Sequence, residues 1–236
     1  MRMSRIMKNY KTLLFDVDDT LLDFHAAQDS ALDQLFSSVG IEPTDNVKQA
    51  YATYNQSLWE KLERNEITRD ELMAVRFPTF FKEYFDKELP NNSLNDRYLS
   101  FLAQGHQEIP GARELLATLT ARDYELYVVT NGVKAIQEKR LQESGFDQYF
   151  KQIFISEILG AQKPSPVFFK RAFAQIDDFD KDKALIIGDS LSSDMLGGQN
   201  AGIDTLWLNR KGQVADPKLK INLEVDSLAQ IGELLG

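Results

Sequence analysis

The sequence predicts an α/β fold, in which a doubly wound, Rossmann-like parallel sheet carries an inserted domain made only of helices. Short β-rich runs that are apolar on both faces alternate with helix-like segments, as in a parallel sheet covered on both sides. Several of these runs end in polar side chains, at the edge where such sheets bind ligands. Residues 24–105 differ, because their apolar residues recur only at helical spacing.

Length and composition are those of a soluble globular protein. The chain has 236 residues, of which 43% are hydrophobic and 27% charged, which suffices for one or two domains. No apolar run approaches the roughly 18 residues of a membrane span, and no signal-peptide core follows the basic N-terminal residues. The sequence contains no cysteine and only two histidines, which leaves oxygen atoms as the expected metal ligands. We therefore expect a cytoplasmic location.

The charge of the chain limits its partners. A formal net charge of −9 disfavours binding to nucleic-acid polymers or to an anionic membrane surface. A small anionic substrate is still compatible with this charge, because a bound cation reverses the local field within one cleft. We expect a monomer or a small homo-oligomer that acts on a small molecule.

The β-rich runs and helical patterns follow one another in a regular order. The predicted strands are 13–15, 125–130, 152–155, 184–188 and 205–208. The predicted helices between them are 112–120, 135–144, 166–174 and 194–201. Ser165 is a typical N-cap for the third of these helices, and Pro166 suits its first position.

The stretch between the first two strands predicts a separate helical domain. Its apolar residues, such as Leu32, Leu35 and Phe36, recur at helical spacing, which indicates four or five helices. Hinges are expected near residues 23–26 and 104–111, where Pro110 and Gly111 favour a turn. The predicted domains are an α/β core, residues 1–23 and 106–236, and a helical cap, residues 24–105.

The first candidate motif is Asp16-Val17-Asp18-Asp19-Thr20, directly after the first strand. Three carboxylates this close repel one another, and a divalent cation would remove that cost. Asp16 and Asp18 are two residues apart, so an extended strand end points both side chains to the same side. We expect Asp16 to be a nucleophile and metal ligand, and Asp18 to be the general acid and base.

Later strands end in further candidates. Thr130 and Asn131 end the second strand before a helix, which suits an anion site, and Lys163 lies in the loop after the third strand. Asp189 ends the fourth strand and is a candidate metal ligand, and Asp194 follows in the next helical turn. Each also has an ordinary structural explanation, such as an Asn-Gly turn, a solvated lysine or an acidic first helical turn.

Together, these motifs resemble the haloacid dehalogenase superfamily of phosphohydrolases over essentially the whole chain. Its four motifs match Asp16-Val17-Asp18-Asp19-Thr20, Thr130-Asn131, Lys163-Pro164, and Gly188-Asp189-Ser190 through Asp194. One departure is Asp19, which stands where glycine is common and whose backbone amide is expected to face a phosphate.

The resemblance implies Mg²⁺-dependent transfer of a phosphoryl group in two steps. Mg²⁺, or Mn²⁺ in its place, would be held by Asp16, Asp189, the carbonyl of Asp18 and water. Asp16 would form an aspartyl-phosphate, while Thr130, Asn131, Lys163 and the backbone at Asp19 bind phosphate oxygens. Asp194 would support the metal shell. The expected partner is a small phosphomonoester.

The predicted cap carries the features that bear on the substrate. Asn55, Trp59 and Arg76 look similar to the cap of bacterial nucleotidases that act on pyrimidine or noncanonical nucleoside 5'-monophosphates. Trp59 could stack on a base, but a tryptophan in such a position more often belongs to the core, and Arg76 could reach a base carbonyl or pair with a carboxylate of the cap. The main alternative is a sugar-phosphate phosphatase or phosphomutase with the same catalytic residues and another cap.

Three other classes of protein fit the sequence less well. A true dehalogenase of this superfamily lacks the second aspartate of the first motif, so Asp18 argues against that reaction. A phosphonate hydrolase needs a cap lysine, and nothing in the sequence marks Lys48 or Lys61 for that role. A catalytically silent binding module would not need all four motifs.

Overall fold

The computed structural model describes residues 9–89 and 91–235. It divides into two compact units, which we call the α/β unit (Met1–Asp23 and Gln107–Gly236) and the helical unit (Phe24–His106). The boundary after His106 lies one residue beyond the predicted domain limit. The predicted domains also include residues 1–8, 90 and 236, which lie outside the described residues. In the described ranges, no helix is both long and apolar enough to cross a membrane.

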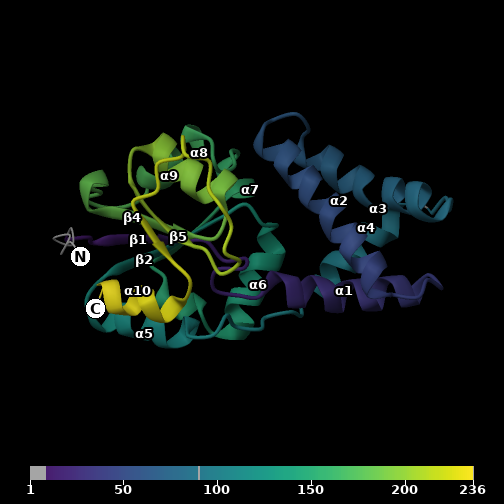
Figure 1. Ribbon diagram of the computed structural model, residues 1–236, viewed down its shortest axis with the longest axis horizontal. Coiled ribbons are helices and arrows are strands. Elements are labelled where there is room, and N and C mark those ends of the chain that lie inside the picture. The colour runs from purple at the N-terminus through teal and green to yellow at the C-terminus, as the bar shows by residue number, and fades with distance from the viewer. Residues whose placement is uncertain (1–8, 90, 236) are drawn as a thin grey trace. The chain divides into compact units, whose positions relative to one another are not determined.

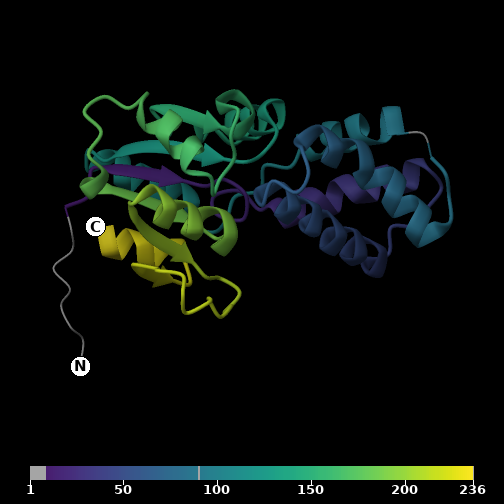
Figure 2. The ribbon, with the colours of Figure 1, turned by 90° about the horizontal axis from the view of Figure 1, so that it is seen from above.

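A parallel sheet forms the centre of the α/β unit, as predicted (Figures 1 and 2). In spatial order β3-β2-β1-β4-β5-β6, its described strands are β3 Gln152–Ile155, β2 Glu125–Thr130, β1 Thr12–Phe15, β4 Ala184–Gly188, β5 Asp204–Leu208 and β6 Leu223–Val225. Strand β1 lies in the middle, where Leu14 is paired with Tyr127 on one side and Ile186 on the other. The ends of β1, β2 and β4 are therefore neighbours.

Helices cover both faces of the sheet, which confirms the doubly wound prediction (Figure 1). The α-helices of this unit are α5 Ala112–Ala121, α6 Lys134–Ser144, α7 Ser156–Leu159, α8 Pro166–Phe173, α9 Leu196–Ala201 and α10 Leu228–Leu235. Three short helices of other types are η1 Asp147–Tyr149, η2 Lys181–Lys183 and η3 Leu191–Met195, of which η3 is π-helical. Side chains alternate along each strand, so Leu13 and Phe15 pack on the face covered by α5, α6 and α10. Leu14 packs on the other face, with α7 and α8.

Helices joined by loops are the only regular elements among the described residues of the helical unit. They are α1 Phe24–Ser38, α2 Asp45–Glu63, α3 Arg69–Phe85 and α4 Asn91–Leu102. Thr68 caps α3 in a capping box, in which its hydroxyl accepts from the Glu71 amide and the Glu71 carboxylate accepts from the Thr68 amide. Aromatic side chains fill the interior, and the rings of Tyr51 and Phe77 stack with centroids 5.0 Å apart.

The two chain segments that lead into and out of the helical unit are joined to each other. The amide of Asp23 donates to the carbonyl of Gln107 (2.8 Å), and the amide of Ile109 donates to the carbonyl of Leu21 (2.9 Å). We call these paired segments, residues 21–23 and 107–109, the stem. Because the stem belongs to the α/β unit, this unit holds together both points at which the helical insert begins and ends.

Candidate active site

The site lies where β1, β2 and β4 end. Asp16 directly follows β1, and its amide donates to the carbonyl of Ile187 in β4 (2.9 Å), which extends the ladder by one residue. Thr130 ends β2, and Asp189 follows β4. Because parallel neighbours end at the same edge of a sheet, these polar side chains gather at one place, as the sequence predicts.

The ammonium group of Lys163 lies at the centre of this site. Its Nζ donates to Oδ1 of Asp16 (2.7 Å), to Oδ1 of Asp194 (2.6 Å) and to the carbonyl of Val129 (2.8 Å). The Lys163 side chain is 1% exposed and that of Asp194 is 0% exposed. A buried ammonium needs such partners, since burial without them costs several kcal/mol. Lys163 therefore joins the first and fourth motifs.

Burial and excess negative charge shift the titration of the central groups. Burial raises the pKa of Asp16 to about 8; nearby Lys163 opposes this shift, and Asp194 and Asp18 add to it. Burial, followed by the charges of Asp16 and Asp194, also raises the pKa of Asp189 well above its usual value. Burial alone would lower the pKa of Lys163, but Asp16 and Asp194 more than offset it, so the pKa is raised. The site therefore favours uptake of positive charge.

The carboxylates are arranged as a cation site would require. Asp16, Asp189 and Asp194 each contribute one oxygen atom, and these atoms all lie within 4.8 Å of one another. Both oxygens of Asp194 already accept hydrogen bonds, Oδ1 from Lys163 and Oδ2 from the amide of Ser190 (3.1 Å). The donor set of hard oxygens with excess negative charge fits Mg²⁺ or Mn²⁺, with Asp16 and Asp189 as the more available ligands.

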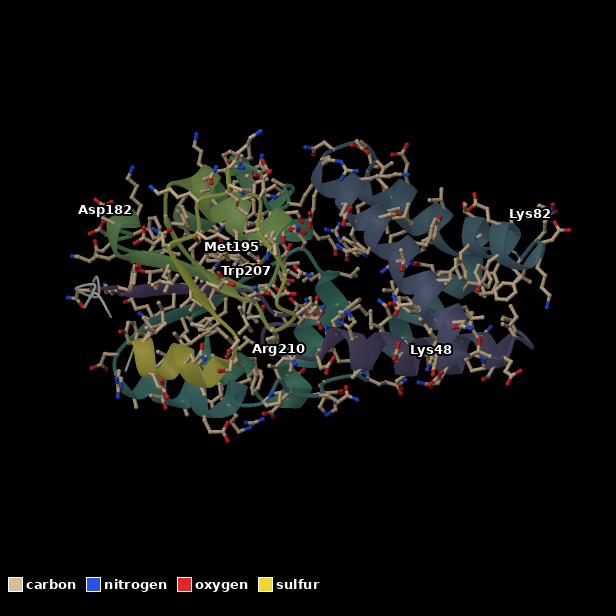
Figure 3. All side chains as sticks on the ribbon, viewed as in Figure 1. Lys48, Lys82, Asp182, Met195, Trp207 and Arg210 are labelled. Carbon is tan, nitrogen blue, oxygen red and sulfur yellow. The ribbon has the colours of Figure 1, made fainter. Side chains whose placement is uncertain are left out.

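A glycine at the end of β4 makes room for the Asp194 carboxylate. A Cβ atom at Gly188 would overlap the side chain of Asp194. The hydroxyl of Ser190 accepts from the amide of Ser193 (3.2 Å) and so caps η3, the turn that carries Asp194. The indole Nε1 of Trp207 donates to the Asp189 carbonyl (2.9 Å), and Trp207 is buried within the α/β unit (Figure 3).

The side chain of Asn131 in the second motif contacts the backbone of Lys163 in the third motif. Asn131 exchanges two hydrogen bonds with Lys163, from Nδ2 to the Lys163 carbonyl and from the Lys163 amide to Oδ1, both 2.9 Å. Asn131 thus holds the loop that presents the ammonium group. The hydroxyl of Thr130 accepts from the amide of Gly132 (3.0 Å) and from Nε2 of Gln137 (2.8 Å).

Asp18 has two partners that the sequence analysis missed. Oδ2 accepts from Nε2 of Gln137 (2.9 Å), and Oδ1 accepts from the guanidinium of Arg140, which forms an ion pair with it. Gln137 and Arg140 are each 1% exposed and lie three residues apart on α6. A signal was available: both polar residues fall on the same stripe of this helix as the apolar Ile136 and Leu141.

Asp19 takes a backbone conformation that glycine, the residue expected at this position of the motif, adopts without strain. Its φ of 58° lies in the left-handed region, which aspartate tolerates better than most residues. Its amide donates to the carbonyl of Leu22 (2.8 Å), and its carboxylate lies 3.8 Å from Nζ of Lys211. The expected contact of this amide with phosphate stays a prediction that requires the turn to rearrange.

The predicted substrate residues all lie in the helical unit. Asn55 and Arg76 are buried there, and Nε of Arg76 donates to Oδ1 of Asn95 (2.8 Å). The Arg76 guanidinium also lies over the ring of Tyr98, 4.7 Å from its centroid. Trp59 is half-buried, with the Arg69 guanidinium 5.5 Å from the centre of its ring. These contacts belong to the interior of the unit, and a role in substrate binding stays a prediction.

The fold and site together define a hydrolase, and comparison with known proteins confirms this class. The family profile of haloacid dehalogenase-like hydrolases matches residues 10–202. The chain belongs to this family. Its fold is also that of a dehalogenase crystal structure, with a TM-score of 0.77 at 19% identity over 98% of this chain and 99% of the other.

Three bacterial relatives are similar over most of their length. HAD-hydrolase YfnB of Bacillus subtilis is 44% identical, over 97% of each chain. Pyrimidine 5'-nucleotidase PynA of Streptococcus pneumoniae is 48% identical, over 85% of this chain and 84% of the relative. Pyrimidine 5'-nucleotidase YjjG of Escherichia coli is 30% identical, over 94% and 96%. A crystal structure of YfnB bound to magnesium has a TM-score of 0.91, over 97% of this chain and 100% of YfnB.

Proposed function

We propose that this hydrolase is a Mg²⁺-dependent phosphatase that cleaves nucleoside 5'-monophosphates, with pyrimidine or noncanonical bases, through a phosphorylated Asp16. The observation that carries the phosphatase chemistry is the buried contact of Lys163 with both Asp16 and Asp194. This contact supports the proposal because a fixed positive charge beside Asp16 would offset the repulsion between that carboxylate and the negative phosphoryl group.

The substrate class is supported by the relatives. PynA and YjjG are named as pyrimidine 5'-nucleotidases and match most of this chain. The residues proposed to favour such substrates are Asn55, Trp59 and Arg76. A sugar-phosphate phosphatase or phosphomutase with the same catalytic residues is the alternative that the experiment below must separate. The expected monomer or small homo-oligomer and the cytoplasmic location are carried forward as predictions.

In the first step, a carboxylate oxygen of Asp16 attacks phosphorus and the bond from phosphorus to the ester oxygen breaks. Asp18 gives its proton to the departing alkoxide, so the leaving group departs as a neutral alcohol. Lys163 and the hydroxyl of Thr130 stabilise the equatorial phosphoryl oxygens, while Asn131 keeps the Lys163 loop in place.

In the second step, water attacks the phosphorus of phosphorylated Asp16. Asp18, now a carboxylate, takes a proton from this water, and the bond between phosphorus and the Asp16 oxygen breaks. Inorganic phosphate leaves and Asp16 is restored as a carboxylate, so the balance of atoms and protons closes. The same side chain acts first as acid and then as base, which requires it to stay beside the reaction path.

The oxygen ligands of the site suit Mg²⁺, and the similar YfnB was crystallised bound to magnesium. Asp16 and Asp189 would hold it, with the Asp18 carbonyl and water, and Asp194 would support this shell. When bound, Mg²⁺ supplies charge that neutralises the phosphoryl oxygens. Its charge would also offset the burial and the neighbouring carboxylates that raise the pKa of Asp16 and of Asp189.

Phosphate release from a substrate panel tests the proposal. Uridine, thymidine and cytidine 5'-monophosphates are compared with adenosine 5'-monophosphate, glucose 6-phosphate and glycerol 3-phosphate, with Mg²⁺ or with EDTA. We expect pyrimidine nucleotides to have the highest kcat/KM and EDTA to abolish turnover. Asp16→Asn should be inactive, and Asp18→Asn should lose about 10²–10⁴-fold. Faster hydrolysis of the sugar phosphates would overturn the substrate class, and EDTA-resistant activity would overturn the metal dependence.

A further inference from the structure

Helix α6 holds the Asp18 carboxylate from outside the four motifs. Arg140 forms an ion pair with Oδ1 of Asp18, and Gln137 donates to Oδ2 (2.9 Å). The donors are 1% exposed, whereas the Asp18 side chain is 29% exposed. The two donors on α6 are thus buried, whereas the Asp18 carboxylate that they hold is partly exposed.

The orientation of Gln137 is fixed by its own partners. Its amide nitrogen donates both to Asp18 and to the hydroxyl of Thr130 (2.8 Å), which uses both of its hydrogen atoms. Its Oε1 accepts from the guanidinium of Arg140 (3.1 Å). One amide group therefore connects the proposed acid–base residue to the proposed phosphate-binding hydroxyl, and Arg140 fixes which way the amide points.

The chain around Gln137 is shaped to admit this contact. A Cβ atom at Gly132 would lie 2.5 Å from Nε2 of Gln137, a distance that real Cβ contacts do not reach. The turn that carries Asp18 is already closed by its own backbone, because the amides of Leu21 and Leu22 donate to the carbonyl of Val17 (2.9 and 3.0 Å). The side-chain contacts from α6 are therefore not needed to close the turn; they set the position of the carboxylate.

We propose that Arg140 and Gln137 are positioning residues that fix the place of the Asp18 carboxylate relative to Thr130 and to the bond that is cleaved. The proposal rests on the proposed phosphatase function, in which Asp18 moves a proton to and from the reacting oxygen. Both residues would act through the side chains that they contact, which are Asp18 for both and also Thr130 for Gln137. A general acid–base group that shifts by about 1 Å can lose on the order of 100-fold in rate, so this positioning has a measurable effect.

The test is steady-state hydrolysis of uridine 5'-monophosphate by the full chain with Mg²⁺. Arg140→Ala should lower kcat by about 100-fold with little change in KM, and Arg140→Lys should recover part of the loss. In an Asp18→Asn background, Arg140→Ala should cause no further loss, because its target is already gone. Gln137→Leu and Gly132→Ala should reproduce the kcat effect more weakly.

Lys139→Ala is the matched control, since Lys139 precedes Arg140 on α6 but is 47% exposed and faces Glu143. It should keep wild-type constants. Thermal melting shows which variants are folded; if Arg140→Ala is not, Arg140→Lys and Gln137→Leu decide the question. An equal loss in the Asp18→Asn background, or an effect on KM alone, would overturn the positioning role. No hydrolysis by the wild type would instead reject the proposed function itself.

Discussion

Asp16, the proposed nucleophile, is deeply buried and lies within a group of like charges. Burial raises its pKa to about 8, and the nearby Asp194 and Asp18 add to the shift. The single positive charge of Lys163 balances only part of the negative charge of these carboxylates. Without a divalent cation, the folded protein is therefore expected to keep a proton on this site near neutral pH.

This shift predicts a pH dependence of stability for the metal-free protein. The folded pKa of Asp16 is about 8 and the ordinary value is 3.8, so its favourable contribution is complete below about pH 3.8 and is lost as pH rises through about 8. We expect the melting temperature in EDTA to fall between about pH 5 and pH 8. Asp16→Asn removes this titration, so its melting temperature should fall less over the same range. Parallel pH profiles of variant and wild type would contradict the shift.

A second residue-scale prediction concerns Gly188. Since a Cβ atom there would overlap the Asp194 carboxylate, Gly188→Ala must displace Asp194 from Lys163 and from the Ser190 amide. We expect a loss of about 1–3 kcal/mol in the free energy of unfolding, measured by urea denaturation, and a strong loss of kcat. Gly202→Ala is not a suitable control because of its positive φ, whereas Gly232→Ala has room for the methyl group. Full activity in Gly188→Ala would show that Asp194 is dispensable.

At this scale the sequence was informative where motifs mark a strand end. Asp16, Thr130 and Asp189 lie together because neighbouring parallel strands end at the same edge of the sheet. The alternation of apolar β-rich runs with helices predicts such a sheet. For Gln137 and Arg140 the only mark is their place on the apolar stripe of α6, which indicates burial but names no partner. Their contact with Asp18 follows only from the three-dimensional path of α6.

At the scale of elements, the central strands of the sheet were predicted, whereas the strand β6 at one edge was not. The five predicted strands are present, and the central ones are apolar runs that need two covered faces. Strand β6 (Leu223–Val225) was missed because a three-residue strand has too few alternating positions to be distinguished from a loop. Helix α10 was not predicted either. The predicted helix 194–201 is shorter in the structure, because the π-helical η3 precedes α9 there.

The capping box of α3 predicts an effect confined to stability. Thr68→Ala removes the hydroxyl that accepts from the Glu71 amide (3.2 Å), and should cost about 1 kcal/mol in the free energy of unfolding. Thr68→Ser keeps a hydroxyl and serves as the control. Chemical denaturation monitored by circular dichroism measures both. Equal stability of the Ala variant and the wild type would mean that the cap contributes little to this helix.

At the scale of the whole molecule, two compact units need not respond alike to a ligand. The proposed Mg²⁺ ligands all belong to the α/β unit, so binding should stabilise this unit by about 2.7 kcal/mol at 100 times the dissociation constant. We expect Mg²⁺ to slow amide hydrogen exchange at the ends of β1 and β4 but to leave α2 and α3 unchanged. The Asp189→Asn variant should lose this protection. Equal slowing in both units would contradict a site built by the α/β unit.

The stem has a consequence for how such a chain can change over time. Residues 21–23 and 107–109 bond to one another through their backbones, so the attachment of the insert does not depend on the identity of its side chains. A different helical segment could be spliced between the same two anchor points without disturbing the sheet or the carboxylates beside it. If the helical unit sets the substrate preference, as proposed above, exchange of this unit with that of a relative would change the substrate and leave the residues of the α/β unit in place.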